Sequence, residues 1–181
     1  MRKKIHEPEI KFDIIERADL PAIIRERNKV PETLRTSYML NIDMQEEYYE
    51  KVLSNRASNT RYFKFLLDGR MIGYGGIENI QWENSTGEIS ILIFQGNRGH
   101  GYGEQCVKSI LEYGFNFLNL HSIWGECYYC GNLKFWQKII DKMSYVVRTA
   151  TLYDRKYYNG IYHDSLYFCI SKEVNDDIKR R

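Results

Sequence analysis

The spacing of apolar residues divides the chain into short alternating segments and a few helical ones. Alternation predicts strands over Glu9 to Ile15, Arg61 to Leu67 and Met71 to Ile77, with a hairpin turn at Asp68-Gly69 between the last two. The apolar run from Glu88 to Phe94 predicts a buried strand after a turn at 84–87. Further strands are expected at 122–128, 145–153 and 163–170, the last two around a turn at 158–160.

Four segments have helical character. Asp19 followed by Pro21 predicts a helix start, with the helix running to Asn28, and a second helix is expected after Asp43, to Leu53. The segment 103–118 carries apolar residues at a spacing near 3.6 and predicts an amphipathic helix. A short helix is expected at 132–142.

These elements follow the order β-α-α-β-β-β-α-β-α-β-β, without an internal repeat or a linker rich in Pro, Gly or Ser. This order predicts an α+β fold, with a mixed, mostly antiparallel central sheet flanked by helices on both faces. We expect a single domain over residues 1–181, with a core at about 10–170 and frayed termini.

The charge and hydropathy of the chain argue against nucleic acid and membrane as partners. Its 26 basic and 24 acidic residues give a net charge of +2, too small to attract nucleic acid nonspecifically. No apolar run approaches the ~20 residues that span a bilayer, and no signal peptide is recognisable. We therefore expect a cytoplasmic protein that binds neither nucleic acid nor membrane, with its four cysteines as free thiols.

The segment Ile91 to Glu104 points most directly to a ligand. A buried strand runs into a bend with four glycines, and an amphipathic helix follows at once. Such a bend leaves consecutive main-chain amides free at a helix N-terminus, where the helix dipole also favours anions. The pattern indicates a pyrophosphate site. It does not fit the G-x-G-x-x-G dinucleotide fingerprint in an early βαβ unit, or the Gly-Lys-Ser/Thr of a P-loop.

The bend Arg98-Gly99-His100-Gly101-Tyr102-Gly103 resembles the acetyl-CoA motif R/Q-x-x-G-x-G/A of the GNAT superfamily of N-acetyltransferases. Within that superfamily the chain is similar to the RimJ/RimL-type branch and the nucleotide-amino-sugar N-acetyltransferases. Four short segments carry this similarity: Arg25-x-Arg27-Asn28, Gly73-x-Gly75-Gly76-Ile77, Leu120-His121-Ser122-Ile123 and Gly160-Ile161-Tyr162-His163-Asp164.

The resemblance implies acetyl-CoA as co-substrate and assigns residues to it. The amides of Arg98, Gly99, His100, Gly101, Tyr102, Gly103 and Glu104 would bind the pyrophosphate. The strand Ile91-Leu92-Ile93 would pair with the pantetheine arm and hold the thioester carbonyl. Asn132, Phe135 and Trp136 fall in the segment that follows the next strand and would also border the cofactor.

Acetylation of an amine needs a group that takes up a proton and, for the departing thiolate, a group that gives one. Glu78, at the end of its strand, is the first candidate for the base, and Glu88 on the next strand is the rival. In the superfamily a tyrosine often serves as general acid, but Trp136 stands at that position, and indole cannot act as that acid. Tyr128, Tyr129 or solvent could replace it, or thiolate departure could need no acid.

The first helical region is expected to form one wall of the acceptor site. Arg25, Arg27, Asn28 and Arg35 could bind an anionic acceptor, and Trp82 could stack on a base or sugar. These cations favour an amino-sugar nucleotide or a protein N-terminus over a polyamine. A homodimer is compatible with the sequence.

Two other functions stay open at this point. Because of Trp136, the chain could be a binding module that holds acetyl-CoA without turnover. Cys127 and Cys130 form a C-x-x-C pair, which occurs in thiol oxidoreductases. The chain offers no second pair of ligands at zinc spacing, so we expect no metal.

Overall fold

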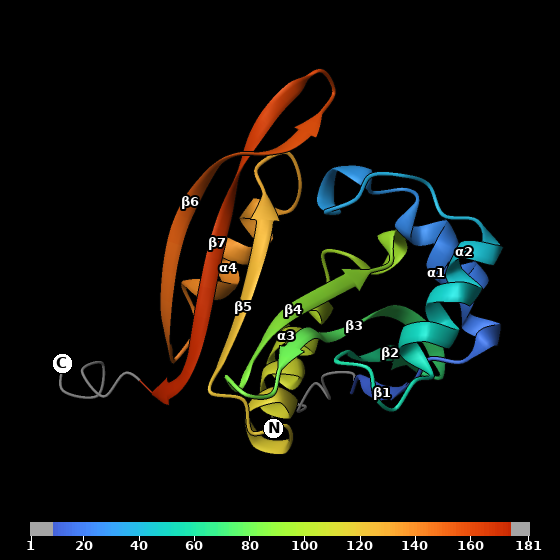
Figure 1. The fold of residues 1–181 in the computed structure, drawn as a ribbon, viewed down its shortest axis with the longest axis horizontal. Helices are drawn as coiled ribbons and strands as arrows, with labels where there is room; N and C mark the ends of the chain where they lie inside the picture. The colour runs from blue at the N-terminus through green and yellow to red at the C-terminus, as the bar shows by residue number, and fades with distance from the viewer. Residues whose placement is uncertain (1–8, 175–181) are drawn as a thin grey trace, which may run out of the picture.

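A seven-stranded mixed sheet runs through the computed structural model, which describes residues 9–174 (Figure 1). The strands are β1 (Lys11–Ile14), β2 (Arg61–Leu67), β3 (Arg70–Gln81), β4 (Thr86–Ile93), β5 (Ser122–Tyr128), β6 (Tyr145–Tyr158) and β7 (Ile161–Val174). Their order in the sheet is β1-β2-β3-β4-β5-β7-β6, and all neighbours are antiparallel except β4 and β5. The predicted fold class is confirmed, whereas the termini for which fraying was predicted lie outside the described residues.

The helices are α1 (Leu20–Arg27), α2 (Ile42–Tyr48), α3 (Tyr102–Glu112) and α4 (Leu133–Ile140). Helix α1 begins after Asp19 and carries Pro21 in its first turn, as predicted. Helix α2 begins earlier than predicted, because Asn41 caps it by accepting a hydrogen bond from the amide of Met44 (2.9 Å). Helices α2 and α3 each continue into a single π-helical segment, to Leu53 and Phe117.

Two hydrophobic layers cover the two faces of the sheet. The larger contains Val107 and Ile110 of α3, together with Trp136 and Ile139 of α4, packed on the strands. On the other face a smaller cluster is formed around Ile23 of α1. No helix within residues 9–174 is long and apolar enough to cross a membrane.

Strands β4 and β5 pair only at their first residues and then separate. The parallel register covers Thr86, Gly87 and Glu88, and the rest of β4 has no partner on that side (Figure 1). One edge of β4 is therefore open beyond Glu88, in the middle of the sheet rather than at its border. An internal strand edge of this kind leaves main-chain hydrogen-bonding groups available to a ligand.

Strands β6 and β7 extend beyond the predicted ranges and project past the end of β5 as a two-stranded ribbon (Figure 1). The turn at Asn159-Gly160 has positive φ at both residues (50° and 84°), as a tight hairpin requires. Tyr153, Tyr157 and Tyr162 on this ribbon are exposed. The alternation of polar and apolar positions that marks a half-buried strand is therefore weak here. This explains why the sequence underestimates the lengths of β6 and β7.

Candidate active site

A cavity of about 800 Å³ opens beside the separated strands. Its floor is formed by β3 and β4, and α1, α2 and the connecting segment 33–40 form its wall. Tyr128 at the end of β5, with Asn132 and Trp136 at the start of α4, closes the opposite side. The volume suits a small ligand or the reactive end of a larger one.

Two glutamates face this cavity from directly opposed positions, Glu78 on β3 and Glu88 on β4. Glu88 is buried and forms a bidentate ion pair with Arg35, one of its bonds measuring 3.2 Å. It also accepts a hydrogen bond from the Asn79 side chain (2.7 Å). Both carboxylate oxygens of Glu88 are thus occupied by donors.

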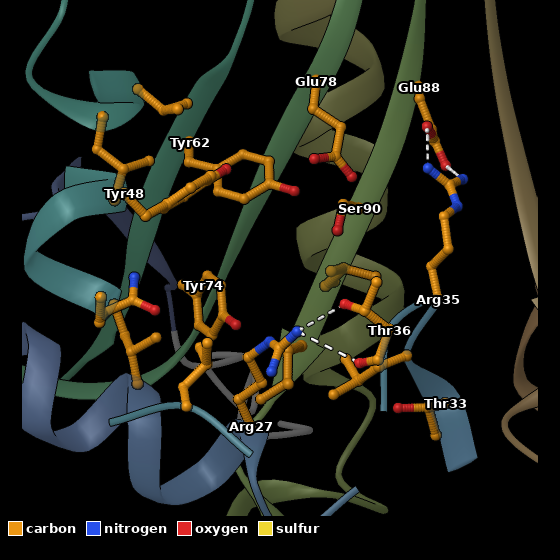
Figure 2. Close-up of a pocket in the computed structure, with 18 of the residues that line it drawn as sticks. Arg27, Thr33, Arg35, Thr36, Tyr48, Tyr62, Tyr74, Glu78, Glu88 and Ser90 are labelled. Carbon is orange, nitrogen blue, oxygen red and sulfur yellow. Dashed lines mark hydrogen bonds and ion pairs between the residues drawn. The ribbon is translucent and has the colours of Figure 1, made fainter. Parts of the chain in front are cut away.

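Glu78 has a different environment, shown in Figure 2. It forms no ion pair with any residue in the described range. Burial raises its pKa, and the charge of Glu88 adds to the rise, while the hydroxyls of Tyr62 and Ser90 oppose it. A raised pKa makes a carboxylate a stronger base, which is the property that a general base requires.

Three tyrosines lie on one side of this carboxylate: Tyr48 of α2, Tyr62 of β2 and Tyr74 of β3 (Figure 2). Burial raises the pKa of each, that of Tyr74 to about 12, so all three are neutral phenols at physiological pH. Neutral aromatic rings beside a carboxylate favour a bound organic cation.

The glycine-rich bend has the geometry of an anion site. Gly99 and Gly101 both have φ of +84°, and Gly101 immediately precedes α3. Within the described residues the amides from Gly99 to Gly103 donate to no protein acceptor. A run of free amides at the start of an eleven-residue helix forms a concave donor surface for phosphate oxygens.

The open edge of β4 leads from this bend toward the two glutamates. The amide of Phe94 donates to the carbonyl of Ile72 on β3 (2.8 Å), so by antiparallel alternation the main-chain groups of Ile91 and Ile93 face away from β3. Arg98 occupies the Ile93 carbonyl through its Nε (2.9 Å). The amide of Ile93 and both groups of Ile91 are left for a ligand along the gap.

Comparison with known proteins agrees with this geometry. A family model described as an acetyltransferase (GNAT) domain matches residues 11–132, more than half of the chain. The chain belongs to the GNAT acetyltransferases. It is therefore an N-acetyltransferase with acetyl-CoA as its co-substrate, as the bend predicted.

Solved structures share the GNAT fold with this chain. A spermidine N-acetyltransferase from Vibrio cholerae in complex with CoA and spermine superposes with a TM-score of 0.79 at 23% identity, covering 90% of this chain and 95% of that one. A dodecameric structure of spermidine N-acetyltransferase from the same organism gives 0.76 at 22%, covering 90% and 94%. No curated protein matches the chain in sequence.

Several of the residues predicted to bind acetyl-CoA lie in the bend or line the cavity. The free amides of the bend fit a pyrophosphate, and Ile91, Leu92, Asn132 and Trp136 line the cavity. Phe135 is placed differently, since its ring packs on Gly103 and on Trp136. Glu104 pairs with Lys142 (3.2 Å), and the rings of His100 and Tyr102 stack at 5.5 Å.

Trp136 stands where many GNAT enzymes carry a tyrosine, and it is largely a core residue. Its ring lies 4.6 Å from that of Phe168, and only a small part borders the cavity. Tyr128 faces the cavity from the end of β5. Burial raises the pKa of Tyr128, and the neighbouring Arg35 opposes the rise. Tyr128 thus remains protonated at neutral pH and can donate a proton.

Three residues predicted to bind the acceptor do not line the cavity. Arg25 is exposed and pairs with Glu26 (3.2 Å). Asn28 clamps the main chain of Leu40 through two hydrogen bonds of 2.8 and 2.9 Å, which is a structural role. Trp82 lies in the β3–β4 turn, 47% exposed, with the Arg61 guanidinium 5.8 Å from its ring. We therefore assign no contact with the acceptor to any of the three.

The predicted cationic wall is also largely neutralised. Arg35 is paired with Glu88, and Arg27 donates to the main chain of Thr36 and Tyr38 and to the Thr36 hydroxyl (3.1 Å). The expectation of an anionic acceptor rested on these arginines as free ligands. Their partners lie in the protein itself.

The cysteine pair lacks the features of a redox site. Cys127 is buried, and burial raises its pKa to about 12; burial also raises the pKa of Cys130. Since the thiolate is the reactive form, these environments suppress thiol chemistry.

Sequence reasoning missed the tyrosines beside Glu78, because a β-bulge decides how two of them are arranged. The Asp68-Gly69 hairpin alone would pair Tyr62 with Gly75 and place Tyr74 on the opposite face of the sheet. The register shift between Phe65 and Leu66 pairs Tyr62 with Gly76 instead, and Tyr74 becomes its diagonal neighbour, with ring centroids 6.3 Å apart. Tyr48 lies on α2, and no local pattern in the sequence relates that helix to these strands.

Proposed function

We propose that this enzyme acetylates a small, positively charged organic amine, which binds in the cavity beside Glu78. The amine nitrogen attacks the thioester carbonyl directly, so a C–N bond forms and the C–S bond of acetyl-CoA breaks. Glu78 takes one proton from the ammonium before the attack. Tyr128 gives its proton to the departing thiolate and regains one from the nitrogen, which loses its second proton as the amide forms. The observation that supports this proposal most directly is the contrast between the two glutamates. Glu78 has a raised pKa and no ion-pair partner among the described residues, whereas Glu88 is bound by Arg35 and Asn79.

The donor would lie along β4. Its pyrophosphate would accept hydrogen bonds from the free amides between Gly99 and Gly103, and its arm would follow the open edge of β4 at Ile91 and Ile93. This direction brings the thioester toward Glu88, the residue of β4 at which its pairing with β5 ends and the open edge begins. The amine would then approach from the side of α1 and α2, since Tyr48, Tyr62 and Tyr74 lie there (Figure 2).

The charges around the cavity favour a cationic acceptor. Of the carboxylates that line it, Glu47, Glu88 and Glu126 are each paired with a basic side chain. Glu78 is the unpaired one in the described part of the chain, and it sits beside neutral aromatic rings. An ammonium in this position gains both a carboxylate and the faces of tyrosine rings. The amine bound by the Vibrio cholerae neighbour, spermine, belongs to this class, although that likeness concerns the fold.

The amino-sugar nucleotides and protein N-termini expected from the RimJ/RimL-type resemblance are the alternatives. An amino-sugar nucleotide would bring a diphosphate into a site whose arginines are already engaged. A protein N-terminus would suit the unpaired carboxylate but requires room for a peptide beyond the wall formed by residues 33–40.

The decisive experiment measures CoA release from acetyl-CoA with spermine, an amino-sugar nucleotide and a short peptide as acceptors. We expect turnover with spermine, and a fall of about 10²–10⁴-fold in kcat for Glu78→Gln with the affinity for CoA unchanged. Glu47→Gln is the matched control, because it removes a paired carboxylate from the same cavity wall. Turnover restricted to the nucleotide or the peptide would replace the proposed acceptor class. Full activity of Glu78→Gln would remove the proposed base, and CoA binding without turnover on any amine would favour a binding module.

A further inference from the structure

Lys156 is a buried lysine on β6 that the chemistry described above does not use. It is 4% exposed, and its ammonium donates to the carbonyl of Leu34 and to the hydroxyl of Ser37. The same nitrogen lies 5.3 Å from the centroid of the Tyr128 ring. Burial lowers the pKa of Lys156, which indicates that this ammonium has given up much of its hydration.

The local structure of β6 is arranged to turn this side chain inward. The pairing of β6 with β7 is irregular between Leu152 and Lys156. The strand β6 advances by four residues there, while β7 advances by only two. Asp154 lies in this bulge with φ of +54°, and its amide donates to the Asp164 side chain (3.1 Å). Bulges of this kind re-aim side chains next to active sites. An unpaired bulge and a buried cation both lower the free energy of unfolding. Their occurrence together in one strand suggests a functional reason for the inward position of Lys156.

The two acceptors of Lys156 bracket a functional dipeptide. Leu34 and Ser37 stand on either side of Arg35 and Thr36, and both of these line the cavity. Arg35 holds Glu88, and Thr36 accepts hydrogen bonds from Arg27 (Figure 2). One ammonium on β6 therefore holds both ends of the segment that carries the partner of Glu88.

Residues 33–40 have other contacts, both inside the segment and at its ends. Inside it, Arg35 pairs with Glu88 of β4, and Arg27 donates to the main chain of Thr36 and Tyr38. The remaining contacts lie at the ends. The Cys130 thiol is 3.5 Å from the Glu32 carbonyl, and a side chain at Gly131 would meet that carbonyl at 3.1 Å. At the other end, Asn28 fixes Leu40. The contacts at the ends fix where the segment leaves and returns, and Lys156 of β6 and Arg27 of α1 hold its centre over the cavity.

We propose that Lys156 is a positioning residue for acetyl transfer: it seats residues 34–37 over the cavity, so that Arg35 neutralises Glu88 and the acceptor wall is closed beside Glu78. This inference rests on the proposed function. Lys156 lies outside the cavity lining and touches neither substrate; it acts through the segment that it holds. The bend and the open edge of β4, which would bind acetyl-CoA, do not depend on it.

The test uses Lys156→Met, which keeps the length of the side chain and removes its charge. We expect kcat/KM for spermine to fall by about 10-fold or more, because two hydrogen bonds to a charged donor are lost. The dissociation constant for CoA, measured by calorimetry, should stay within about 2-fold of the wild type. If the effect passes through Arg35, the double variant Lys156→Met/Arg35→Ala should be little worse than Arg35→Ala alone.

A second readout does not require activity. Trypsin cleaves after arginine, and Arg35 is an exposed arginine in the segment that Lys156 holds. Release of the segment in Lys156→Met should speed cleavage after Arg35 several-fold, because cleavage requires local opening. The control is Lys172→Met on β7, which also removes a lysine bonded to a main-chain carbonyl, that of Phe115 (2.8 Å). It should change neither acetylation nor cleavage after Arg35.

The outcomes separate the role of Lys156 from the proposed function of the enzyme. Should Lys156→Met fail to fold, Ser37→Ala removes one of the two acceptors and is expected to act in the same direction by about 3-fold. Unchanged kinetics and unchanged cleavage after Arg35 would overturn the inference, as would a loss of CoA affinity equal to the loss in kcat/KM. A wild type that acetylates no amine would refute the proposed function instead, while the cleavage experiment would still test the role of Lys156.

Discussion

The repulsion between Glu78 and Glu88 can be tested through the pH dependence of acetylation. The two residues are directly opposed on β3 and β4, so their Cβ atoms are about 5 Å apart. For carboxylates about 6 Å apart at an effective dielectric constant of about 20, the repulsion is about 2.8 kcal/mol. This energy disfavours the ionised form of Glu78 and so raises its pKa. Arg35 cancels part of the charge of Glu88, and if about half remains, the repulsion that opposes ionisation of Glu78 is about 1.4 kcal/mol.

The perturbation is Glu88→Gln. It removes the negative neighbour and leaves Arg35 without its carboxylate, and both changes favour the ionised form of Glu78. A group whose pKa is raised must lose its proton at higher pH before it can act as a base, so lowering that pKa moves the onset of activity to lower pH. We expect the acidic limb of kcat/KM to shift down by about one unit or more, whatever happens to the maximal rate.

The assay records CoA release against pH for the wild type, Glu88→Gln and Glu126→Gln. The ionisation of the acceptor itself contributes equally to all three profiles and cancels in the comparison. Glu126 is a second buried carboxylate at the cavity, paired with Arg155 (3.1 Å) and not among the groups that shift Glu78. Its variant should move the limb by less than about 0.3 unit. An acidic limb that stays in place or rises in Glu88→Gln would refute the assignment of that limb to Glu78.

Three further variants test the fold and the donor site. Gly101→Glu combines strain at φ of +84° with a negative charge on the anion site, so the affinity for CoA, measured by calorimetry, should fall by about 100-fold or more. The control Gly69→Glu, at φ of +75° in a distant turn, should leave that affinity intact. Gly103→Val should lower the free energy of unfolding by about 1–3 kcal/mol in urea titration, because its Cβ would lie 2.8 Å from the Phe135 ring; an unchanged midpoint would contradict the packing of α3 on α4. Lys64→Met leaves three carboxylates around a buried site unpaired and should cost about 1–2 kcal/mol in the same assay, and an equal or higher stability would show that this cluster is not stabilising.

Much of the fold could be predicted because its signals are local. The strands Arg61–Leu67 and Ser122–Tyr128 were predicted to the residue, each bounded by turn residues or a clear run of apolar ones. The bend was predicted for the same reason, since free amides at a helix start follow from glycine spacing alone. The charged wall of the cavity was not predictable in this way. Arg35 looks like a free ligand in the sequence, and its partner Glu88 lies 53 positions away.

The same limit applies to Lys156, whose acceptors are more than a hundred positions earlier in the chain. Their contact depends on how far the β6–β7 ribbon projects past β5, and the weak alternation of that ribbon gave no measure of its length. The proposed donor site therefore follows from local pattern, whereas the proposed character of the acceptor site rests on pairing of charges that are distant in the sequence.

A crystal structure of the enzyme with CoA and spermine tests the central claim most directly. The account predicts the pyrophosphate within hydrogen-bonding distance of the amides between Gly99 and Gly103, the pantetheine arm along Ile91, and an amine nitrogen within hydrogen-bonding distance of the Glu78 carboxylate. CoA bound away from the bend, or an amine nitrogen that approaches the sulfur of CoA from a side remote from Glu78, would contradict it.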